Sequence, residues 1–157
     1  MKSVLFICHG NICRSPMAEF IFKDMVRKAG VEEARIDSAA VSYEEEGNDI
    51  YPPAKRTLHG HGIPFGRHSA HRVTDAEASE YDVIIVMDAS NRRLLSRIIS
   101  PMNMSKVHLM MEYAGKDSDV SDPWYTGDFE KTYRDITEGC AGLLESLSQA
   151  EPISTVG

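Results

Sequence analysis

A short apolar run near the start of the chain ends at a cysteine and passes directly into a loop and a helix start. Residues 4–7 are four consecutive apolar residues, three of them β-branched or aromatic, and predict a buried strand that stops at Cys8. Gly10 and Asn11, two residue types that accept positive φ readily, follow in the loop. Residues 15–16 are Ser-Pro, typical of a helix N-cap and first helical position. This order predicts an anion site, because loop N–H groups converge there and the positive end of the helix adds to their field.

Two chemically active side chains belong to this loop, Cys8 at its start and Arg14 at its end. A guanidinium can hold two oxygens of a phosphoryl group. The groups that attract phosphate also favour a thiolate, so Cys8 is a candidate nucleophile. A buried cysteine at a strand end is more often an ordinary core residue, but that interpretation leaves the Cys-x5-Arg-Ser spacing unexplained. The loop is not a nucleotide-binding P-loop, because it lacks the Gly-Lys-Ser/Thr that holds phosphates and Mg²⁺.

Strands and helices alternate along the rest of the chain. The continuous apolar run at 81–87 predicts a central strand covered on both faces. We therefore expect a single α/β domain over residues 1–157, doubly wound around a four-stranded parallel sheet, with the tail from about 150 to 157 disordered. Ligands of such sheets bind beyond the carboxyl ends of the strands, where the Cys8 loop lies. The other predicted strands are 35–41 and 106–110, and the predicted helices are about 16–30, 52–60, about 88–100 and 129–147.

Charge and cysteine content narrow the possible partners. The formal net charge of −7 argues against binding to nucleic acid or to anionic membranes. The acidic run at 44–49 is expected to be a solvated surface segment. The first apolar run is too short for a signal peptide or a transmembrane helix, so we expect a cytoplasmic protein, with a monomer favoured. Three cysteines are too few, and odd in number, for a disulfide framework.

Several segments together resemble one family. Residues 4–19, read as VLFICHGNICRSPMAE, look like the signature of the low-molecular-weight protein tyrosine phosphatases, and further matches follow in family order at 37–40, 61–64, 81–82, 87–91 and 122–125. The resemblance implies the doubly wound fold with the phosphatase loop at the end of the first strand. It also implies a metal-independent and cofactor-independent enzyme that hydrolyses phosphotyrosine in proteins or in small aryl phosphates through a cysteinyl-phosphate.

The resemblance also supplies a proton donor, Asp122. On its own an Asp-Pro pair is usually a turn, and the aromatic residues after it are usually core. The family's acid lies in the matching loop, so Asp122 is expected to protonate the leaving phenol and then to activate water. Trp124 and Tyr125 are expected to form a wall of the pocket for a flat substrate.

Supporting roles carry over by matching position. Asn11 is expected to hold the loop in its unusual shape, with Ser38 and His68 behind it and His71 as the rival of His68. Ser15 is expected to hydrogen-bond Cys8. The resemblance also implies a reversible bond between Cys8 and Cys13 that shields the nucleophile. The residues expected to bind substrate or phosphate are His9, Gly10, Asn11, Ile12, Cys13, Ser15, Trp124 and Tyr125.

Three rival functions remain open at the level of sequence. A protein-arginine phosphatase resembles this chain closely, but members with that activity tend to carry threonine where this chain has Ile12. A thioredoxin-coupled arsenate reductase needs further cysteines, and Cys140 falls on a face expected to be core. A non-catalytic phosphate-binding module would keep Arg14 but not need Cys8 or Asp122. His59 and His61 have no further ligand at suitable spacing, so no metal site is expected.

Overall fold

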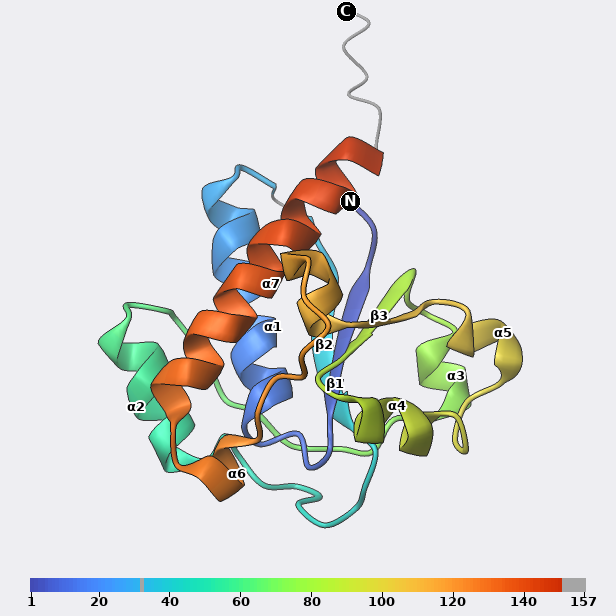
Figure 1. The fold of residues 1–157 in the computed structure, drawn as a ribbon, viewed down its shortest axis with the longest axis horizontal. Helices are drawn as coiled ribbons and strands as arrows, with labels where there is room; N and C mark the ends of the chain where they lie inside the picture. Colours follow the sequence, from blue (N-terminus) through green and yellow to red (C-terminus); the bar gives the residue numbers. More distant parts are fainter. Residues whose placement is uncertain (32, 151–157) are drawn as a thin grey trace, which may run out of the picture.

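A computed structural model describes residues 1–31 and 33–150 of the chain. It contains a four-stranded, all-parallel sheet with the order β2-β1-β3-β4 (Figure 1), which confirms the predicted α/β architecture. The elements, in chain order, are β1 (Val4–Cys8), α1 (Arg14–Lys28), β2 (Ile36–Ala40), α2 (Pro52–Gly60), α3 (Asp75–Ala78), β3 (Val83–Val86), α4 (Ala89–Leu95), α5 (Pro101–Met104), β4 (Val107–Leu109), η1 (Met110–Ala114), α6 (Pro123–Thr126) and α7 (Phe129–Ala150).

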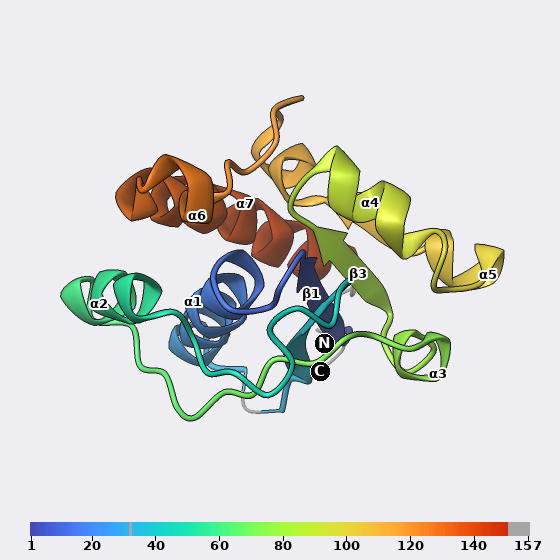
Figure 2. The same cartoon turned by 90° about the horizontal axis from the view of Figure 1, so that it is seen from below.

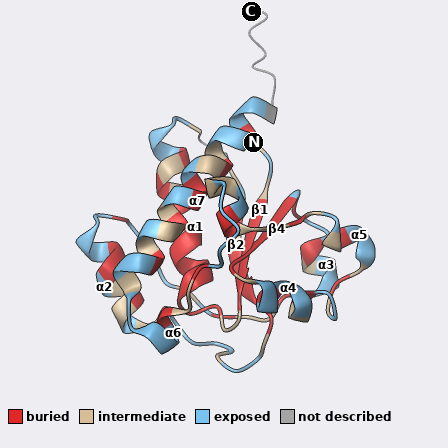
Figure 3. Ribbon diagram, viewed as in Figure 1, coloured by how far each residue is buried: buried red, intermediate tan, exposed pale blue. Residues whose placement is uncertain are grey.

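The two central strands are apolar along their whole length because helices cover both faces of the sheet. Every residue of β1 and β3 is buried. Alternate β1 side chains point to opposite faces: Phe6 belongs to the cluster formed with α1, α2 and α7, while Leu5 and Ile7 belong to the cluster formed with α3 and α4. Figure 3 shows the buried colour concentrated on the strands and on the inward sides of the helices.

The long helix α7 packs closely on η1 through two glycines. A β-carbon built at Gly142 would lie 1.9 Å from the carbonyl oxygen of Tyr113, and one at Gly139 would lie 2.9 Å from that of Met110. Such distances are far inside van der Waals contact, so neither position accepts a side chain without movement of the backbone. The apolar face of α7 is buried as predicted, and Cys140 is a core residue with 0% exposure.

Two helix predictions are wrong in detail. Helix α1 begins at Arg14, with Cys13 as the N-cap residue and no capping hydrogen bond from its side chain, so Ser15 is inside the helix and is not its cap. The single helix predicted from 88 to about 100 is shorter: Asp88 caps α4, which ends at Leu95. The tail prediction at about 150–157 falls outside the described residues, apart from the last residue of α7.

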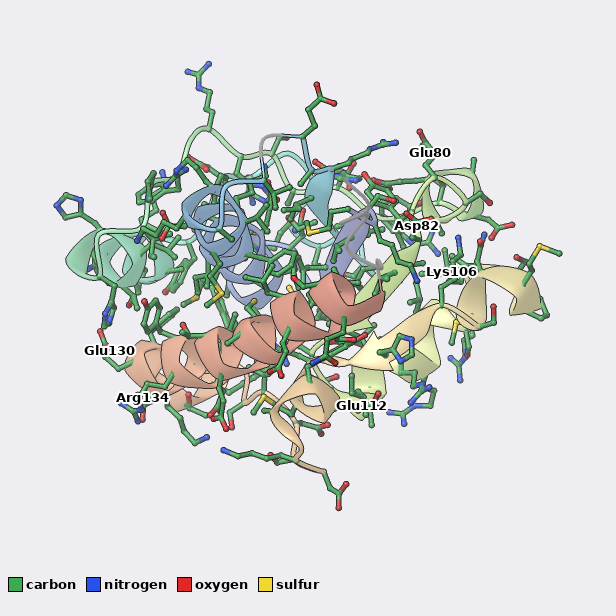
Figure 4. All side chains as sticks on the ribbon, turned by 90° about the horizontal axis from the view of Figure 1, so that it is seen from above. Glu80, Asp82, Lys106, Glu112, Glu130 and Arg134 are labelled. Carbon is green, nitrogen blue, oxygen red and sulfur yellow. The ribbon has the colours of Figure 1, made fainter. Side chains whose placement is uncertain are left out.

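The amino ends of the strands are closed by short polar contacts. The Ser3 N–H donates to Asp82 Oδ2 at 2.9 Å, and Lys106 Nζ donates to the carbonyl oxygen of Tyr81 at 2.8 Å. Glu80, Asp82 and Lys106 lie near one another in Figure 4. Each of these contacts joins segments that precede different strands, so they fix the strands relative to one another at this end of the sheet.

The carboxyl ends of the strands meet at the other end of the domain. Viewed from that end, the loop after β1 lies between α6 on one side and the loop that follows β2 on the other (Figure 2). Among the described residues, no helix is long and apolar enough to cross a membrane.

Candidate active site

The loop that follows β1 turns back around the sulfur of Cys8. The backbone N–H of Asn11 donates to Cys8 Sγ at 3.3 Å, and Ser15 Oγ lies 3.1 Å from the same sulfur. Asn11 has φ of 61°, the one positive value at a non-glycine residue in the described chain. Gly10, expected to share that conformation, does not adopt it. The positive φ at Asn11 accompanies a tight loop in which the Asn11 N–H points at the sulfur.

The side chain of Asn11 is fixed by partners on three segments. Its Nδ2 donates to Ser15 Oγ at 2.8 Å and to Ser38 Oγ at 3.0 Å. The side-chain Oδ1 accepts from the backbone N–H of His71 at 3.3 Å, and the main-chain carbonyl oxygen of Asn11 accepts from His68 Nε2 at 2.7 Å. Both histidines therefore hold Asn11 in place, His68 through its ring and His71 through its main-chain N–H. These contacts hold a backbone conformation that is otherwise disfavoured.

The direction of these hydrogen bonds orients the Ser15 hydroxyl. Because Ser15 Oγ accepts from Asn11 Nδ2, its own hydrogen is available for two acceptors, Cys8 Sγ at 3.1 Å and the Ala39 carbonyl oxygen at 3.4 Å. Ser38 in turn donates to Glu19 Oε1 at 2.6 Å, which leaves the Ser38 oxygen to accept from Asn11. Glu19 is buried at 7% exposure and was not identified from the sequence. Its position one helical turn after Ser15, on the buried side of α1, was the available signal.

Arg14 is buried and enters the site from the first residue of α1. Its Nη1 donates to Asp88 Oδ2 at 2.7 Å and to the carbonyl oxygen of Val120 at 2.9 Å, and its Nη2 donates to Asp122 Oδ2 at 3.3 Å. Burial by itself lowers the pKa of this guanidinium, but the neighbouring Cys8, Asp88 and Asp122 raise the pKa above its usual range. Arg14 is thus a fixed cation beside the sulfur.

Asp88 is a second residue that was not predicted to belong to the site. It caps α4, where its Oδ1 accepts from the Asn91 N–H at 2.7 Å. Its other oxygen holds Arg14. A carboxylate directly after a central parallel strand lies at the same end of the sheet as the Cys8 loop, and that was the signal available in the sequence.

Asp122 is positioned by a short helix that begins at proline. It caps α6, where Oδ1 accepts from the Trp124 N–H at 3.0 Å, while Oδ2 faces Arg14. The segment before it is tied to the sheet and to α7: the Val120 N–H donates to the Met87 carbonyl at 2.9 Å, and Thr132 Oγ1 donates to the Ser121 carbonyl at 3.3 Å. These anchors bring a carboxylate from late in the chain to the loop that follows β1.

A single pocket joins these groups. Its floor consists of Cys8 and Arg14, with Asn11 and Ser15 buried directly behind them. Its rim has two walls: the aromatic wall of Trp124 and Tyr125, and the acidic wall of Glu44 and Glu45. The other residues that line it are His9, Gly10, Ile12, Cys13 and Asp122.

The acidic wall adds to an expectation from the sequence. The run at 44–49 was expected to be a solvated surface segment, and it is exposed apart from half-buried Glu45; in addition, Glu44 and Glu45 line the pocket. Glu44 Oε2 lies 3.1 Å from His9 Nε2. A β-carbon at Gly10 would lie 3.3 Å from Glu45 Cγ, so the two loops are in contact. Charge composition alone does not indicate which way a loop folds, and this placement followed only from the tertiary structure.

The remaining cysteines and histidines have simpler surroundings. Cys8, Cys13 and Cys140 are free thiols. Burial raises the pKa of the Cys13 thiol, and Cys8 raises it further. His61 stacks on Tyr133 with ring centroids 3.7 Å apart and contacts Glu130. Among the described residues, no group of three or more His, Cys, Asp or Glu side chains could hold a metal ion.

Fold and site together define a class of protein: a doubly wound α/β domain whose first strand leads into an oxyanion-binding loop with a cysteine at one end and an arginine at the other. Comparison with known sequences specifies the family. A model described as "Low molecular weight phosphotyrosine protein phosphatase" matches residues 3–152, and the chain belongs to this family.

Relatives of known sequence or structure agree with this assignment. The chain is 39% identical over 157 residues to low molecular weight protein-tyrosine-phosphatase YfkJ from Bacillus subtilis, covering 98% of this chain and 100% of that protein. The crystal structure of YfkJ superposes with a TM-score of 0.90 over 96% of this chain and 97% of that chain. The low molecular weight phosphotyrosine protein phosphatase of Homo sapiens is 38% identical over 92% of this chain and 94% of its own length. DARP, a drosophila arginine phosphatase, is 31% identical with a TM-score of 0.85 over 94% of this chain and 98% of that chain.

Proposed function

We propose that this protein hydrolyses phosphotyrosine in proteins, and related small aryl phosphates, through a cysteinyl-phosphate intermediate. The convergence of three groups carries the proposal: Cys8, Arg14 and Asp122 line one pocket, and an N–H and a hydroxyl are directed at the sulfur. The names of the relatives and the family assignment support the same activity.

In the first step the Cys8 thiolate attacks phosphorus in line with the bond to the leaving oxygen. The loop N–H groups and Arg14 stabilise the charge on the three equatorial oxygens. The uncapped N-terminus of α1 contributes its positive end to the same space. As the P–O bond breaks, protonated Asp122 donates its proton to the departing phenolate oxygen, and phenol leaves.

In the second step water displaces the sulfur from phosphorus. The Asp122 carboxylate accepts a proton from water as the water oxygen attacks, the P–S bond breaks, and the thiolate re-forms while phosphate is released. Ser15 stabilises the departing thiolate, because its hydroxyl lies 3.1 Å from Cys8 Sγ and donates to the sulfur as negative charge develops there. The scheme uses no metal or cofactor, because the loop and Arg14 supply the positive field.

The substrate is proposed to enter between the two walls of the rim. Trp124 is 52% exposed and its ring lies 4.8 Å from that of Tyr51, so it offers a supported flat surface to a phenyl ring. Ile12 is apolar and buried, and it lines the pocket next to Cys13 and Ala70. We further propose that the protein acts as a monomer in the cytoplasm, consistent with three free thiols and a net charge of −7.

A protein-arginine phosphatase is the second candidate, because the drosophila arginine phosphatase shares the fold at 31% identity. The apolar Ile12 disfavours it, since no hydroxyl at this position hydrogen-bonds a guanidino group. An arsenate-reductase relay is disfavoured as well: Cys140 has 0% exposure in the core, so it cannot carry a disulfide outward.

Burst kinetics test the proposal. With p-nitrophenyl phosphate in the presence of EDTA, we expect a burst of p-nitrophenol equal to the enzyme concentration, a phosphoenzyme trapped on Cys8, and inhibition by vanadate. Matched phosphotyrosine and phosphoarginine peptides then separate the two candidates. Faster turnover of the phosphoarginine peptide would contradict the tyrosine assignment, and EDTA-sensitive turnover without a phosphoenzyme would contradict the covalent mechanism.

A further inference from the structure

The two walls of the rim together have the composition of a cation site. Glu44 and Glu45 provide carboxylates, and Trp124 and Tyr125 provide aromatic faces across the same pocket. Carboxylates attract an ammonium or guanidinium group, and the face of an aromatic ring does so independently through its quadrupole. The exposed fractions of Trp124 and Tyr125, 52% and 84%, leave both rings accessible to a ligand.

The charges around the pocket favour a substrate that carries such a cation. The phosphoryl group of the substrate is an anion, yet the pocket presents the carboxylates of Glu44 and Glu45 and the sulfur of Cys8, with Arg14 as its fixed cation. Arg14 is already paired with Asp88 at 2.7 Å. Carboxylates at the mouth repel an approaching dianion, so they favour a substrate that brings its own positive charge.

Both carboxylates have a partner beside the pocket, and the Glu44 side chain stays 68% exposed, so its charge is open to an incoming cation. Glu45 Oε2 accepts from Asn48 Nδ2 at 2.7 Å, and its side chain packs over Gly10. Glu44 lies 3.1 Å from His9. The next residue, Glu46, has a different role: its carboxylate accepts from the backbone N–H of Arg72 at 3.2 Å, away from the pocket.

We propose that Glu44 and Glu45, opposite the aromatic wall, select substrates in which a lysine or arginine neighbours the phosphorylated tyrosine. This inference rests on the proposed function and specifies its substrate class. The phosphoryl group occupies the floor, the phenyl ring contacts Trp124, and the neighbouring ammonium or guanidinium group lies between the two walls.

Three phosphotyrosine peptides that differ only in the flanking residues, lysine, glutamine or glutamate, test the inference. At low ionic strength we expect kcat/KM to fall in the order lysine, glutamine, glutamate, with about three- to tenfold per step. Raising the salt concentration to about 0.5 M shortens the Debye length to a few ångströms and so reduces the differences in kcat/KM among the three peptides.

Isosteric variants assign the preference to the acidic wall. Glu45→Gln and Glu44→Gln should each reduce the ratio of kcat/KM for the lysine peptide to kcat/KM for the glutamate peptide by at least about twofold. The double variant should bring this ratio close to one. Glu46→Gln is the matched control, since it removes an identical charge from the same loop outside the pocket, and it should keep the wild-type ratio. Unchanged melting temperatures establish that all variants fold.

Three results would overturn the inference. The first is a wild-type enzyme that hydrolyses all three peptides equally, and the second is a lysine preference that survives the double variant. The third is an equal loss of preference in Glu46→Gln, which would assign the effect to the overall charge of the protein. If no phosphotyrosine peptide is hydrolysed while a phosphoarginine peptide is, the proposed function fails, and this inference fails with it.

Discussion

At the floor of the pocket the side chains are buried and each is held by several partners, whereas at the rim they are exposed and have few. Arg14 is 2% exposed and Asn11 0%, and both make hydrogen bonds to several segments. Tyr125, on the rim, is 84% exposed. Buried, multiply bonded groups are preorganised for one charge distribution, while exposed groups adapt to different ligands. The difference teaches that the floor determines the reaction and the rim selects the substrate, so substitutions in the two regions should affect different kinetic constants.

The largest effect is expected from Cys8→Ser. A serine hydroxyl does not ionise in this loop as a thiol does, so hydrolysis of an aryl phosphate should fall by more than about 10⁴-fold. Tungstate binding should persist, because Arg14 and the loop N–H groups remain, and isothermal titration calorimetry measures it. Cys140→Ala is the control: it removes a thiol from the core and should lower the melting temperature while turnover continues. Undiminished turnover in Cys8→Ser would exclude the covalent mechanism.

Asp122→Ala should slow phenyl phosphate by roughly two to four orders of magnitude, because the poor leaving group no longer receives a proton. The hydrolysis rate of substrates with activated leaving groups, such as p-nitrophenyl phosphate, should fall much less. The dependence of kcat on leaving-group basicity measures this directly. Asp119→Ala, an exposed aspartate on the same segment, should leave the dependence unchanged. An equal loss on every substrate would mean that Asp122 acts through structure and not as the acid.

Asp88→Asn tests whether the floor depends on a positioning residue behind it. Asparagine still caps α4, since its side-chain oxygen accepts the Asn91 N–H, but the charged contact with Arg14 Nη1 is lost. We expect kcat to fall by about ten- to a hundredfold with little change in melting temperature. Asp88→Ala should add a loss of stability. A variant with normal kcat would show that Val120 and Asp122 suffice to orient Arg14.

Trp124→Ala changes the rim, and its effect should be of a different kind. Loss of the flat surface should raise KM for aryl phosphates about three- to tenfold while kcat stays within about threefold. Met102→Ala is the control, because this exposed apolar side chain lies on α5, away from the pocket. If kcat fell as much as KM rose, the assignment of separate tasks to floor and rim would be wrong.

The smallest effect concerns the ion pair of His71 and Glu77, behind the floor. The hydrogen bond from Glu77 raises the pKa of His71 above its ordinary value, against the opposing effect of burial. A raised pKa means that the folded state favours the protonated ring, so the pair stabilises the fold fully below about pH 6.5 and loses this contribution as the pH rises through the raised pKa.

Melting curves of wild type and Glu77→Gln at several pH values measure this contribution. The wild-type advantage should be largest near pH 5.5 and shrink towards pH 9. Because the His71 side chain is 41% exposed, solvent screens the pair and the effect should stay below about 1 kcal/mol. A difference that does not change with pH would show that the contact is not an ion pair.

Local patterns predicted much of this molecule. The buried strand β1, the loop, the central strand β3 and the apolar face of α7 follow from short-range periodicity, and the parallel sheet follows from their alternation. The start of α1 was placed too late because Ser-Pro imitates a helix cap, while the Ser15 hydroxyl is used by Cys8 and Asn11.

Other features depend on contacts between distant segments. Glu19 reaches the site only through Ser38, and Asp88 reaches it only through Arg14, so neither carries a recognisable motif of its own. The acidic wall depends on how the loop after β2 folds back over Gly10. Composition describes the charge of such a loop but not its direction.

The close contact at Gly142 extends its influence to the proton donor. The helix that carries this glycine also carries Thr132, which holds the carbonyl of Ser121 immediately before the acid. A methyl group at Gly142 would overlap the Tyr113 carbonyl, so α7 or η1 would have to move, and a shift of α7 would carry Thr132, the anchor of the acid's loop, with it. The position of the proton donor thus depends on a residue that has no side chain and makes no contact with substrate.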